Sequence, residues 1–270
     1  MLYGIGMVIG TEQLAAYALD GAVVVRGLFT QEQVAQVAAG IDANLASPGP
    51  LALVASGADD PGQFIEDFCN WQRIPQYEDF IRYSPAAAIA KQLMRTRQVR
   101  LHHDHMLVKE AGTQQRTPWH QDQPYYNIAG MQNVSMWMPV DPVPLESSPE
   151  FLAGSHLGPW LMPRTFQDNQ ANWFPAGSLS DLPDIESDRG SYRILGWELD
   201  PGDAVFFHML TLHAAAGSAT RRRAFSVRFI GDDARHAARP WRTSPEFVGL
   251  VEQLPDGAPF DHPLFPLLIG

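Results

Sequence analysis

Cysteine is nearly absent from the chain: Cys69 is the single one among 270 residues. One cysteine excludes an internal disulfide and a zinc site built from several thiolates, and it is compatible with a reducing compartment. The sequence also has no apolar run near the roughly 18 residues that a membrane span requires. Its first residues lack the basic segment and the cleavage site of a secretory signal. We therefore expect a cytoplasmic protein without a membrane partner.

Basic residues are also scarce. The chain has 19 Lys and Arg against 30 Asp and Glu, which gives a net charge of −11. Because nucleic-acid-binding proteins present clustered basic surfaces, this balance argues against a nucleic-acid partner and favours a small-molecule substrate. The one local basic run is 221–223. A hydrophobic fraction of 45% is ordinary for a soluble globular protein, which we expect to be a monomer or a homodimer.

Helical patterns concentrate in the first third of the chain. The segments TEQLAAYALD, TQEQVAQVAAGIDANLA and SPAAAIAKQLM carry apolar residues at helical spacing, with Thr30 as an N-cap of the second and Pro85 in the first turn of the third. A short β-branched run, GAVVVRGLF, separates the first two. We predict that residues 1–97 form a mostly helical outer layer.

Short β-type runs, broken by Gly, Pro, Asn and Asp, follow from residue 98. Many short strands with frequent turn signals are typical of a sandwich or a barrel, and we assign residues 98–235 to such a core. Residues 156–190 are rich in Pro, Asp, Asn and aromatics, which is typical of a lid-like insertion. With a C-terminal extension over 236–270, the prediction is a single domain, mainly β with flanking α-helices.

Two residues of the stretch TPWHQDQPYYN can share a metal ion. His120 and Asp122 lie two apart, so on a strand their side chains point the same way. Taken alone, the two are better explained as a hydrogen-bonded pair at a strand end. A third ligand is offered by His213, which follows the buried-type strand AVFF. Two histidines and one carboxylate are typical of mononuclear non-haem Fe(II) oxygenases; zinc hydrolases use a similar set but also need a general base.

The strand RRRAFSVRF adds a cationic face. Alternation places Arg222 on the same face as Ala224, Ser226 and Arg228, while Arg223 shares the opposite, mostly apolar face. The small, cationic face is suited to a cavity that accepts a carboxylate, because a guanidinium binds a carboxylate through two parallel hydrogen bonds. The order of HxD, distal histidine and arginine is the one expected if 2-oxoglutarate chelates iron and its far carboxylate binds the arginine.

These motifs together resemble a known family, the phytanoyl-CoA dioxygenase-like branch of the Fe(II)/2-oxoglutarate-dependent oxygenases. The resemblance extends over most of the chain, through LDGAVVVRGLFTQEQV, HDHMLVKEAG, TPWHQDQPYYN, VSMWMPVDPV, EFLAGSHLG, DPGDAVFFH, TLHAAAG and RRRAFSVRFIGDD. It implies a double-stranded β-helix, the cupin-like jelly roll. It also implies Fe(II), 2-oxoglutarate as co-substrate and O2, with release of succinate and CO2.

The resemblance further implies a role for particular residues. Iron is expected on His120, Asp122 and His213, which makes these the catalytic residues, and the distal carboxylate of 2-oxoglutarate is expected on Arg222. Lys109 and Trp137 match positions that line the co-substrate pocket. Because the spacing from His213 to the arginines is shorter than in many relatives, Arg223 is kept as an alternative anchor. Ala215 stands where relatives often have a small polar residue.

The substrate contacts and the reaction outcome are left more open. Tyr125 and Tyr126 could clamp an apolar substrate or simply pack in the core. Asp104 or His105 and also Arg228 are candidate substrate contacts, and the aromatic residues of the insertion are candidates for a lid: Trp160, Phe166, Trp173 and Phe174. An intact Asp122 favours hydroxylation, desaturation, epimerisation or ring closure over halogenation. Epimerisation, cyclisation or desaturation in secondary metabolism is the alternative, and a non-catalytic jelly-roll binding protein is a third.

Overall fold

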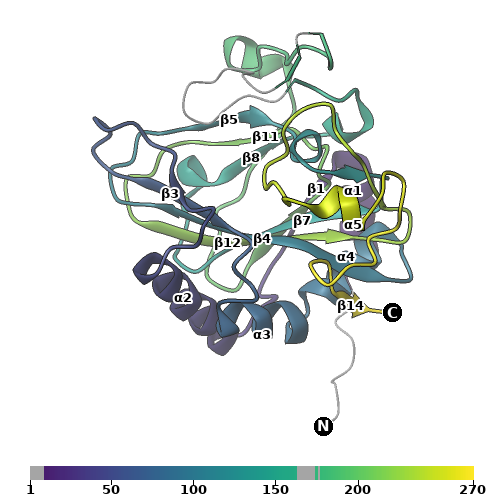
Figure 1. Cartoon of the computed structure of the whole chain (residues 1–270). Coiled ribbons are helices and arrows are strands. Elements are labelled where there is room, and N and C mark those ends of the chain that lie inside the picture. Colours follow the sequence, from purple (N-terminus) through teal and green to yellow (C-terminus); the bar gives the residue numbers. More distant parts are fainter. Residues whose placement is uncertain (1–8, 163–173, 176) are drawn as a thin grey trace.

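A large antiparallel sheet forms one side of the protein. The computed structural model describes residues 9–162, 174, 175 and 177–270. Eight strands make up the large sheet (Figure 1). In spatial order they are β1 (Ala22–Val25), β10 (Ala204–Phe207), β7 (Asn133–Pro139), β12 (Arg222–Ile230), β4 (Val99–Lys109), β3 (Phe64–Phe68) and β2 (Leu53–Val54), with β14 (Leu267–Ile269) paired to β4.

A smaller antiparallel sheet faces the large one, and the two together form the expected jelly roll (Figure 1). Its strands are, in order, β5 (Thr117–His120), β11 (His213–Ala215), β8 (Pro149–Leu152) and β9 (Ile194–Leu195). A separate pair joins β6 (Ile128–Ala129) to β13 (Arg235–His236). Apolar side chains of both sheets, among them Trp137, Phe151 and Phe207, meet in one buried cluster. The mainly β prediction is therefore confirmed.

Helices cover the outer face of the large sheet (Figure 1). They are α1 (Thr11–Asp20), α2 (Gln31–Ala46), α3 (Pro75–Tyr83) and α4 (Ala86–Met94), and a short α5 (Leu250–Gln253) lies near the C-terminus. The side chain of Thr30 accepts a hydrogen bond from the backbone N–H of Gln33, so it caps α2 as its sequence position indicates. The segment 1–97 is less purely helical than predicted, because β1, β2 and β3 all join the large sheet.

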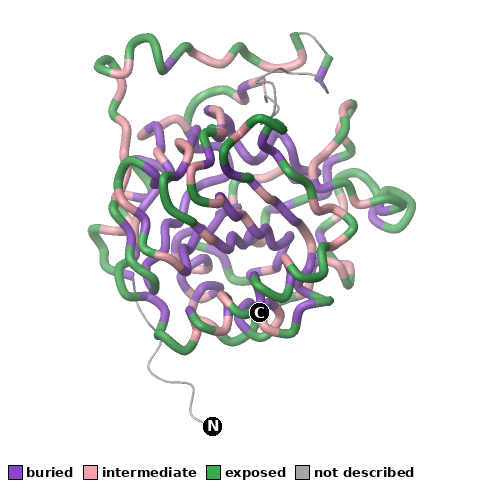
Figure 2. The backbone as a smooth tube through the Cα atoms, turned by 90° about the vertical axis from the view of Figure 1, so that its left-hand side faces the viewer, coloured by how far each residue is buried: buried purple, intermediate pink, exposed green. Residues whose placement is uncertain are grey.

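Strand alternation in β12 separates the helical layer from the interior of the jelly roll. Phe225, Val227 and Phe229 belong to the buried cluster that includes the helices, whereas Ala224 belongs to the cluster between the sheets. Phe225 is fully buried, and its ring stacks on Tyr77 of α3 with centroids 4.2 Å apart. Figure 2 shows the buried residues concentrated in the centre of the molecule. One face of β12 thus packs against the helices, and the other faces the interior between the two sheets.

Phe225→Ala is expected to destabilise the protein by about 3–5 kcal/mol, because it removes a fully buried ring and leaves a cavity between sheet and helices. The measurement is the free energy of unfolding from urea denaturation. Leu19→Ala is the control, since Leu19 is 64% exposed and its truncation should cost no more than about 0.5 kcal/mol. A cost below about 1 kcal/mol for Phe225→Ala would contradict this packing.

The remaining segments contribute loops and a second small core. Leu250, Leu254, Phe260 and Phe265 of the C-terminal segment pack against Tyr125 and Tyr126, which follow β5. The lid-like insertion predicted over 156–190 is described only in part, since residues 163–173 and 176 lie outside the described residues. Within the described ranges, no helix has the length and apolar character to cross a membrane.

Candidate metal centre

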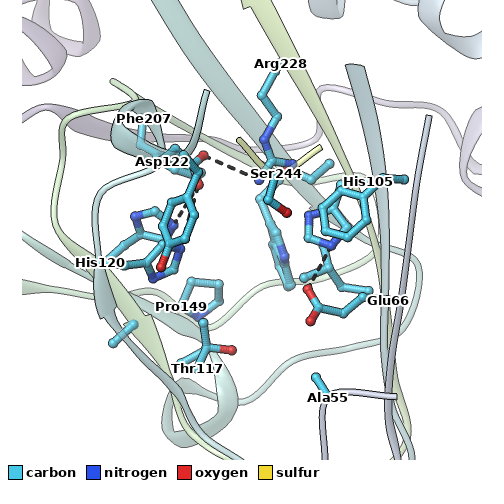
Figure 3. A pocket seen from close by; sticks show the side chains of 18 of the residues that line it. Ala55, Glu66, His105, Thr117, His120, Asp122, Pro149, Phe207, Arg228 and Ser244 are labelled. Carbon is cyan, nitrogen blue, oxygen red and sulfur yellow. Dashed lines mark hydrogen bonds and ion pairs between the residues drawn. The ribbon is translucent and has the colours of Figure 1, made fainter. Parts of the chain in front are cut away.

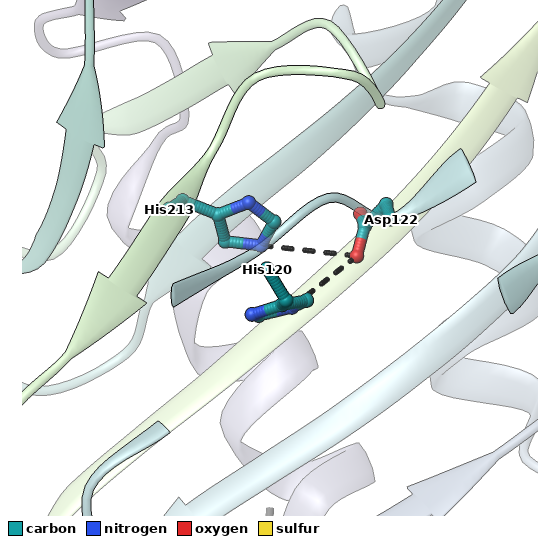
Figure 4. A group of neighbouring side chains, drawn as sticks. All are labelled: His120, Asp122 and His213. Carbon is teal, nitrogen blue, oxygen red and sulfur yellow. Dashed lines mark ion pairs between the residues drawn. The ribbon is translucent and has the colours of Figure 1, made fainter. Parts of the chain in front are cut away.

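Three potential metal ligands converge inside the jelly roll. His120 ends β5, His213 begins β11, and the two residues are paired in the register of the smaller sheet. Asp122 lies two residues beyond the end of β5. One ligand atom from each residue lies within 4.8 Å of the others, and all three side chains are buried (Figure 4). The Nε2 atoms of both histidines lie 3.7 Å from Oδ1 of Asp122. Atoms bound to one ion at about 2.1 Å can be up to about 4.2 Å apart, so these contacts fit a shared metal.

Backbone carbonyls fix the orientation of both imidazoles. Nδ1 of His120 lies 2.8 Å from the carbonyl oxygen of Pro118, and Nδ1 of His213 lies 2.9 Å from that of Thr211. Because a carbonyl can only accept, each Nδ1 must donate, which leaves the Nε2 lone pair directed at the common point. Burial, with a smaller effect from His120, lowers the pKa of His213 to about 3. Neutral imidazoles are the form that binds a metal.

Asp122 is held so that one oxygen is left for a metal. Its Oδ2 accepts a hydrogen bond of 2.7 Å from the hydroxyl of Ser135, and a guanidinium nitrogen of Arg228 lies 3.4 Å away. Burial by itself raises the pKa of this carboxyl, but Arg228 and the two histidines outweigh it and hold the pKa well below its usual value. Asp122 is therefore an anion with Oδ1 turned toward the histidines. The donor set fits a divalent iron ion.

Ser135→Ala is expected to weaken Fe(II) binding by about 10-fold or more, because second-sphere hydrogen bonds orient the ligating carboxylate. The measurement is an anaerobic Fe(II) titration. Ser56→Ala is a matched control: its hydroxyl accepts from the backbone of Phe64, away from the three ligands, so iron affinity should not change. Equal iron affinities for the two variants would show that Ser135 does not orient Asp122.

A cavity of about 330 Å³ adjoins the three ligands (Figure 3). Arg222 lines it from β12, donates from Nη1 to the carbonyl oxygen of Ser147, and lies 5.7 Å from the centroid of the Trp137 ring. Its Nε has no partner, and no carboxylate of the described residues lies within ion-pair distance. Burial lowers the pKa of Arg222 to about 10, so the side chain stays a cation at neutral pH.

Arg223 points to the opposite face of β12. Its guanidinium forms ion pairs with Asp141 at 2.8 Å and with Asp42 at 3.0 Å. It does not line the cavity. Strand parity thus separates the two candidate anchors, and Arg222 is the one that faces the three ligands.

The structure brings Trp137 to the cavity but not Lys109. Nζ of Lys109 donates to the carbonyl oxygens of Gln115 and Ala216, both at 2.7 Å, and lies over the ring of Phe64. Burial, followed by the nearby charge of Arg222, lowers the pKa of Lys109 to about 6. The expected contact of Lys109 with the co-substrate pocket is therefore not found, because both hydrogen bonds of its amino group go to backbone carbonyls of two loops.

The HHDH segment in β4 divides between two faces. His105 lines the cavity, whereas Asp104 faces away and accepts hydrogen bonds from the backbone N–H groups of Asn70 and Trp71 at 3.0 and 2.9 Å. Asp104 anchors a turn, so its suggested substrate contact is not found. His102 binds Asn127 and stacks on Phe265. None of these side chains joins the group of three ligands.

The other suggested substrate contacts lie at the cavity. Tyr125, Tyr126 and Arg228 all line it, and Nε of Arg228 donates to the hydroxyl of Tyr126 at 3.1 Å. Phe174 packs edge-on against Tyr125. Trp160 lies beside the guanidinium of Arg239. Phe166 and Trp173, also suggested for a lid, lie outside the described residues.

Family membership follows from a comparison of the whole sequence. The profile of the family described as Phytanoyl-CoA dioxygenase (PhyH) matches residues 17–224. The chain belongs to this family. It is an iron- and 2-oxoglutarate-dependent oxygenase, and the buried His–Asp–His group agrees with that chemistry. No curated protein matches the chain.

Solved structures share the PhyH fold over nearly the whole chain. The non-haem alpha ketoglutarate-dependent carbocyclase SnoK from nogalamycin biosynthesis is 23% identical, with a TM-score of 0.75 and 96% of each chain covered. The epimerase SnoN, in complex with Fe3+, alpha ketoglutarate and nogalamycin RO, is 21% identical, with a TM-score of 0.75 over 95% of this chain and 97% of that one. EctD from S. alaskensis, with 2-oxoglutarate and 5-hydroxyectoine, is 19% identical, with a TM-score of 0.67 over 93% and 85%.

Several cavity residues of this PhyH family member come from segments that were not predicted to reach it. Ala55 and Glu66 belong to the segment expected as an outer layer, and Ser244 belongs to the C-terminal extension. The strand-like run FIEDF gave a partial signal, because it holds two adjacent acidic residues, Glu66 and Asp67, which a strand points to opposite faces. Ala55 and Ser244 had none, because their position depends on how distant loops fold back.

Proposed function

We propose that this PhyH family oxygenase binds iron through His120, Asp122 and His213 and binds 2-oxoglutarate with its distal carboxylate on Arg222. One observation carries the proposal: the three ligands and a buried arginine without a carboxylate partner in the described residues line the same cavity. A buried cation is costly unless it is paired, so Arg222 favours an anion from outside the chain. A carboxylate satisfies it through charge-assisted hydrogen bonds.

The residues of the site perform binding and orientation. Iron, when bound, supplies the activation of dioxygen and the oxidation chemistry. The two Nδ1–H groups fix the imidazoles, Ser135 and Arg228 fix Asp122, and Arg222 sets the direction of the co-substrate. The aromatic side chains at the cavity, including Tyr125 and Trp137, limit access of water. Binding and orientation by the residues, together with oxidation at iron, fit the oxidation of a second molecule bound beside the co-substrate.

Hydroxylation is the outcome that we propose first, and the intact carboxylate ligand Asp122 argues against halogenation. A cavity of about 330 Å³ suits a small or medium organic molecule. The family name suggests an acyl-CoA, but the chain has no second basic cluster for the phosphates of coenzyme A. Epimerisation, cyclisation or desaturation in secondary metabolism is the alternative, favoured by the similarity to SnoK and SnoN over nearly the whole chain.

The proposal includes the setting of the reaction. A net charge of −11 supports a small-molecule substrate rather than a nucleic acid. The single cysteine fits a reducing compartment such as the cytoplasm. We propose a monomer or homodimer, since no residue of a second copy is needed to complete the described site.

Product mass after turnover under 18O2 separates the outcomes. Candidate substrates are first ranked by the succinate that they release from 2-oxoglutarate, and the product of the best is then weighed. Hydroxylation predicts a product that gains one oxygen atom from 18O2. A product of unchanged mass or one that has lost two hydrogen atoms would replace hydroxylation by the alternative. Absence of succinate with every candidate, in enzyme loaded with iron and 2-oxoglutarate, would contradict the oxygenase proposal.

A further inference from the structure

A second buried polar pair lies in the cavity, across from the three metal ligands (Figure 3). It consists of Glu66 on β3 and His105 on β4, two strands that are neighbours in the large sheet. Nε2 of His105 lies 3.0 Å from Oε2 of Glu66, and the residues are only 4% and 2% exposed. The pairing of β3 with β4 brings them together, so the pair is part of the cavity wall.

The Glu66–His105 pair carries a net negative charge. His105 donates from Nε2 to the carboxylate, and its Nδ1 is buried without a hydrogen-bond partner. Burial lowers the pKa of His105 despite the contact with Glu66, so the imidazole is neutral. Among the described residues no Lys or Arg lies within ion-pair distance of Glu66. The carboxylate therefore has no direct ion pair with a cation of the described residues, and its interaction with Lys109 is one of charge at longer range.

One carboxylate oxygen of Glu66 has no hydrogen-bond donor in the described part of the chain. His105 donates to Oε2, and Oε1 accepts no hydrogen bond from any described residue. Its neighbours at the cavity offer no donor: Phe68 stacks on the ring of His105 at 3.9 Å, and Leu53 and Leu107 are paired opposite Glu66 in the sheet. Because buried carboxylates are normally paired or fully hydrogen-bonded, the missing donor is expected from an occupant of the cavity.

The co-substrate cannot supply that donor. A 2-oxo dicarboxylate offers only acceptor oxygens, and its negative charges are repelled by a second carboxylate. Arg222, whose Nε donor has no partner, lies on β12. Glu66 lies on β3, and β4 separates these two strands. The cavity thus has a positive group at Arg222 and a negative group at Glu66. The first suits the co-substrate, and the second suits a different molecule.

We propose that Glu66, oriented by His105, is the substrate-recognition residue of this oxygenase and that it binds an N–H or O–H donor of the organic substrate. The substrate class is then an amine or an alcohol, and a carboxylic acid is rejected. This inference rests on the proposed function, since it requires the substrate to lie between the Glu66–His105 pair and the three metal ligands.

The test uses three probes with one carbon skeleton: cyclohexylamine, cyclohexanol and cyclohexanecarboxylate. Each is bound anaerobically to the enzyme loaded with Fe(II) and 2-oxoglutarate, and the dissociation constant is measured by equilibrium dialysis. The amine or the alcohol should bind about 10-fold or more tightly than the carboxylate, because a hydrogen bond to a charged acceptor is worth about that factor. If the amine binds more tightly, the contact with Glu66 is ionic. If the alcohol binds more tightly, the contact is a hydrogen bond from a neutral group.

Glu66→Gln should remove most of this preference while it keeps the shape of the side chain. Glu78→Gln is the matched control, because Glu78 pairs with Arg82 on the surface of α3 and should leave all three constants unchanged. The proposal is overturned if the carboxylate binds as well as the other probes, if none of the three binds, or if Glu66→Gln keeps the preference.

The charge-transfer absorption of bound Fe(II) and 2-oxoglutarate separates this failure from failure of the proposed function. A band present in both wild type and Glu66→Gln, with no donor preference, would overturn only the role of Glu66. Absence of the band in the wild type would instead contradict the proposed iron and co-substrate site.

Discussion

Asp122→Ala should abolish turnover of 2-oxoglutarate and weaken Fe(II) binding by more than about 100-fold, since loss of an outer hydrogen bond alone costs about 10–100-fold. The variant removes the only anionic member of the ligand group and leaves two neutral imidazoles. It also removes the ion-pair partner of Arg228, whose Nη2 lies 3.4 Å from Oδ2. Anaerobic Fe(II) titration and succinate formation measure the two effects.

Two controls make this result specific to the metal. Asp59→Ala removes an exposed carboxylate outside the cavity and should leave iron binding and turnover unchanged. Circular dichroism of Asp122→Ala should match the wild type, which shows that the fold is intact. A folded Asp122→Ala protein that binds Fe(II) with the affinity of the wild type would remove Asp122 from the ligand set.

Arg222→Leu should raise the KM for 2-oxoglutarate by about 100-fold, because two charge-assisted hydrogen bonds to the distal carboxylate are lost. Arg223→Leu is a control on the adjacent position of the same strand. Arg223 points away from the cavity to Asp141 and Asp42, so its loss should leave the KM unchanged and lower only thermal stability. The measurement is succinate release as a function of 2-oxoglutarate concentration.

A conservative change tests whether charge alone is sufficient. Arg222→Lys keeps the cation but loses the planar donor pair, so its KM should lie between those of the wild type and Arg222→Leu. Fe(II) affinity without co-substrate should be the same in all three proteins. A larger effect of Arg223→Leu than of Arg222→Leu on the KM would reverse the assignment of the anchor.

Local patterns carried most of the prediction of the site. The HxD spacing pointed to the right two ligands, although strand alternation does not bring them together, because Asp122 lies beyond the end of β5 in a helical backbone conformation. The alternation of β12 separates Arg222 from Arg223 whatever the rest of the fold does. The same alternation puts Phe225 and its apolar neighbours on the mostly apolar face, and in the structure this face packs against helices. These conclusions hold because the period of a strand is set by the backbone.

Contacts between distant segments could not be predicted in this way. Lys109 shares the strand of His105, but its amino group donates to backbone carbonyls of two loops, and no sequence pattern predicts where those loops lie. Asp104 accepts a hydrogen bond from the backbone of the segment that follows β3. This contact can be predicted only when the pairing of β3 with β4 is known. The resemblance to a family likewise gave no role for Glu66.

The most direct test of the iron and co-substrate site is anaerobic titration of the purified wild-type protein with Fe(II) and 2-oxoglutarate, followed by visible absorption. We predict a metal-to-ligand charge-transfer band that appears only when both are present, saturates at one equivalent of each, and is absent in Asp122→Ala. No band in the wild type, or the same band in Asp122→Ala, would contradict the assignment.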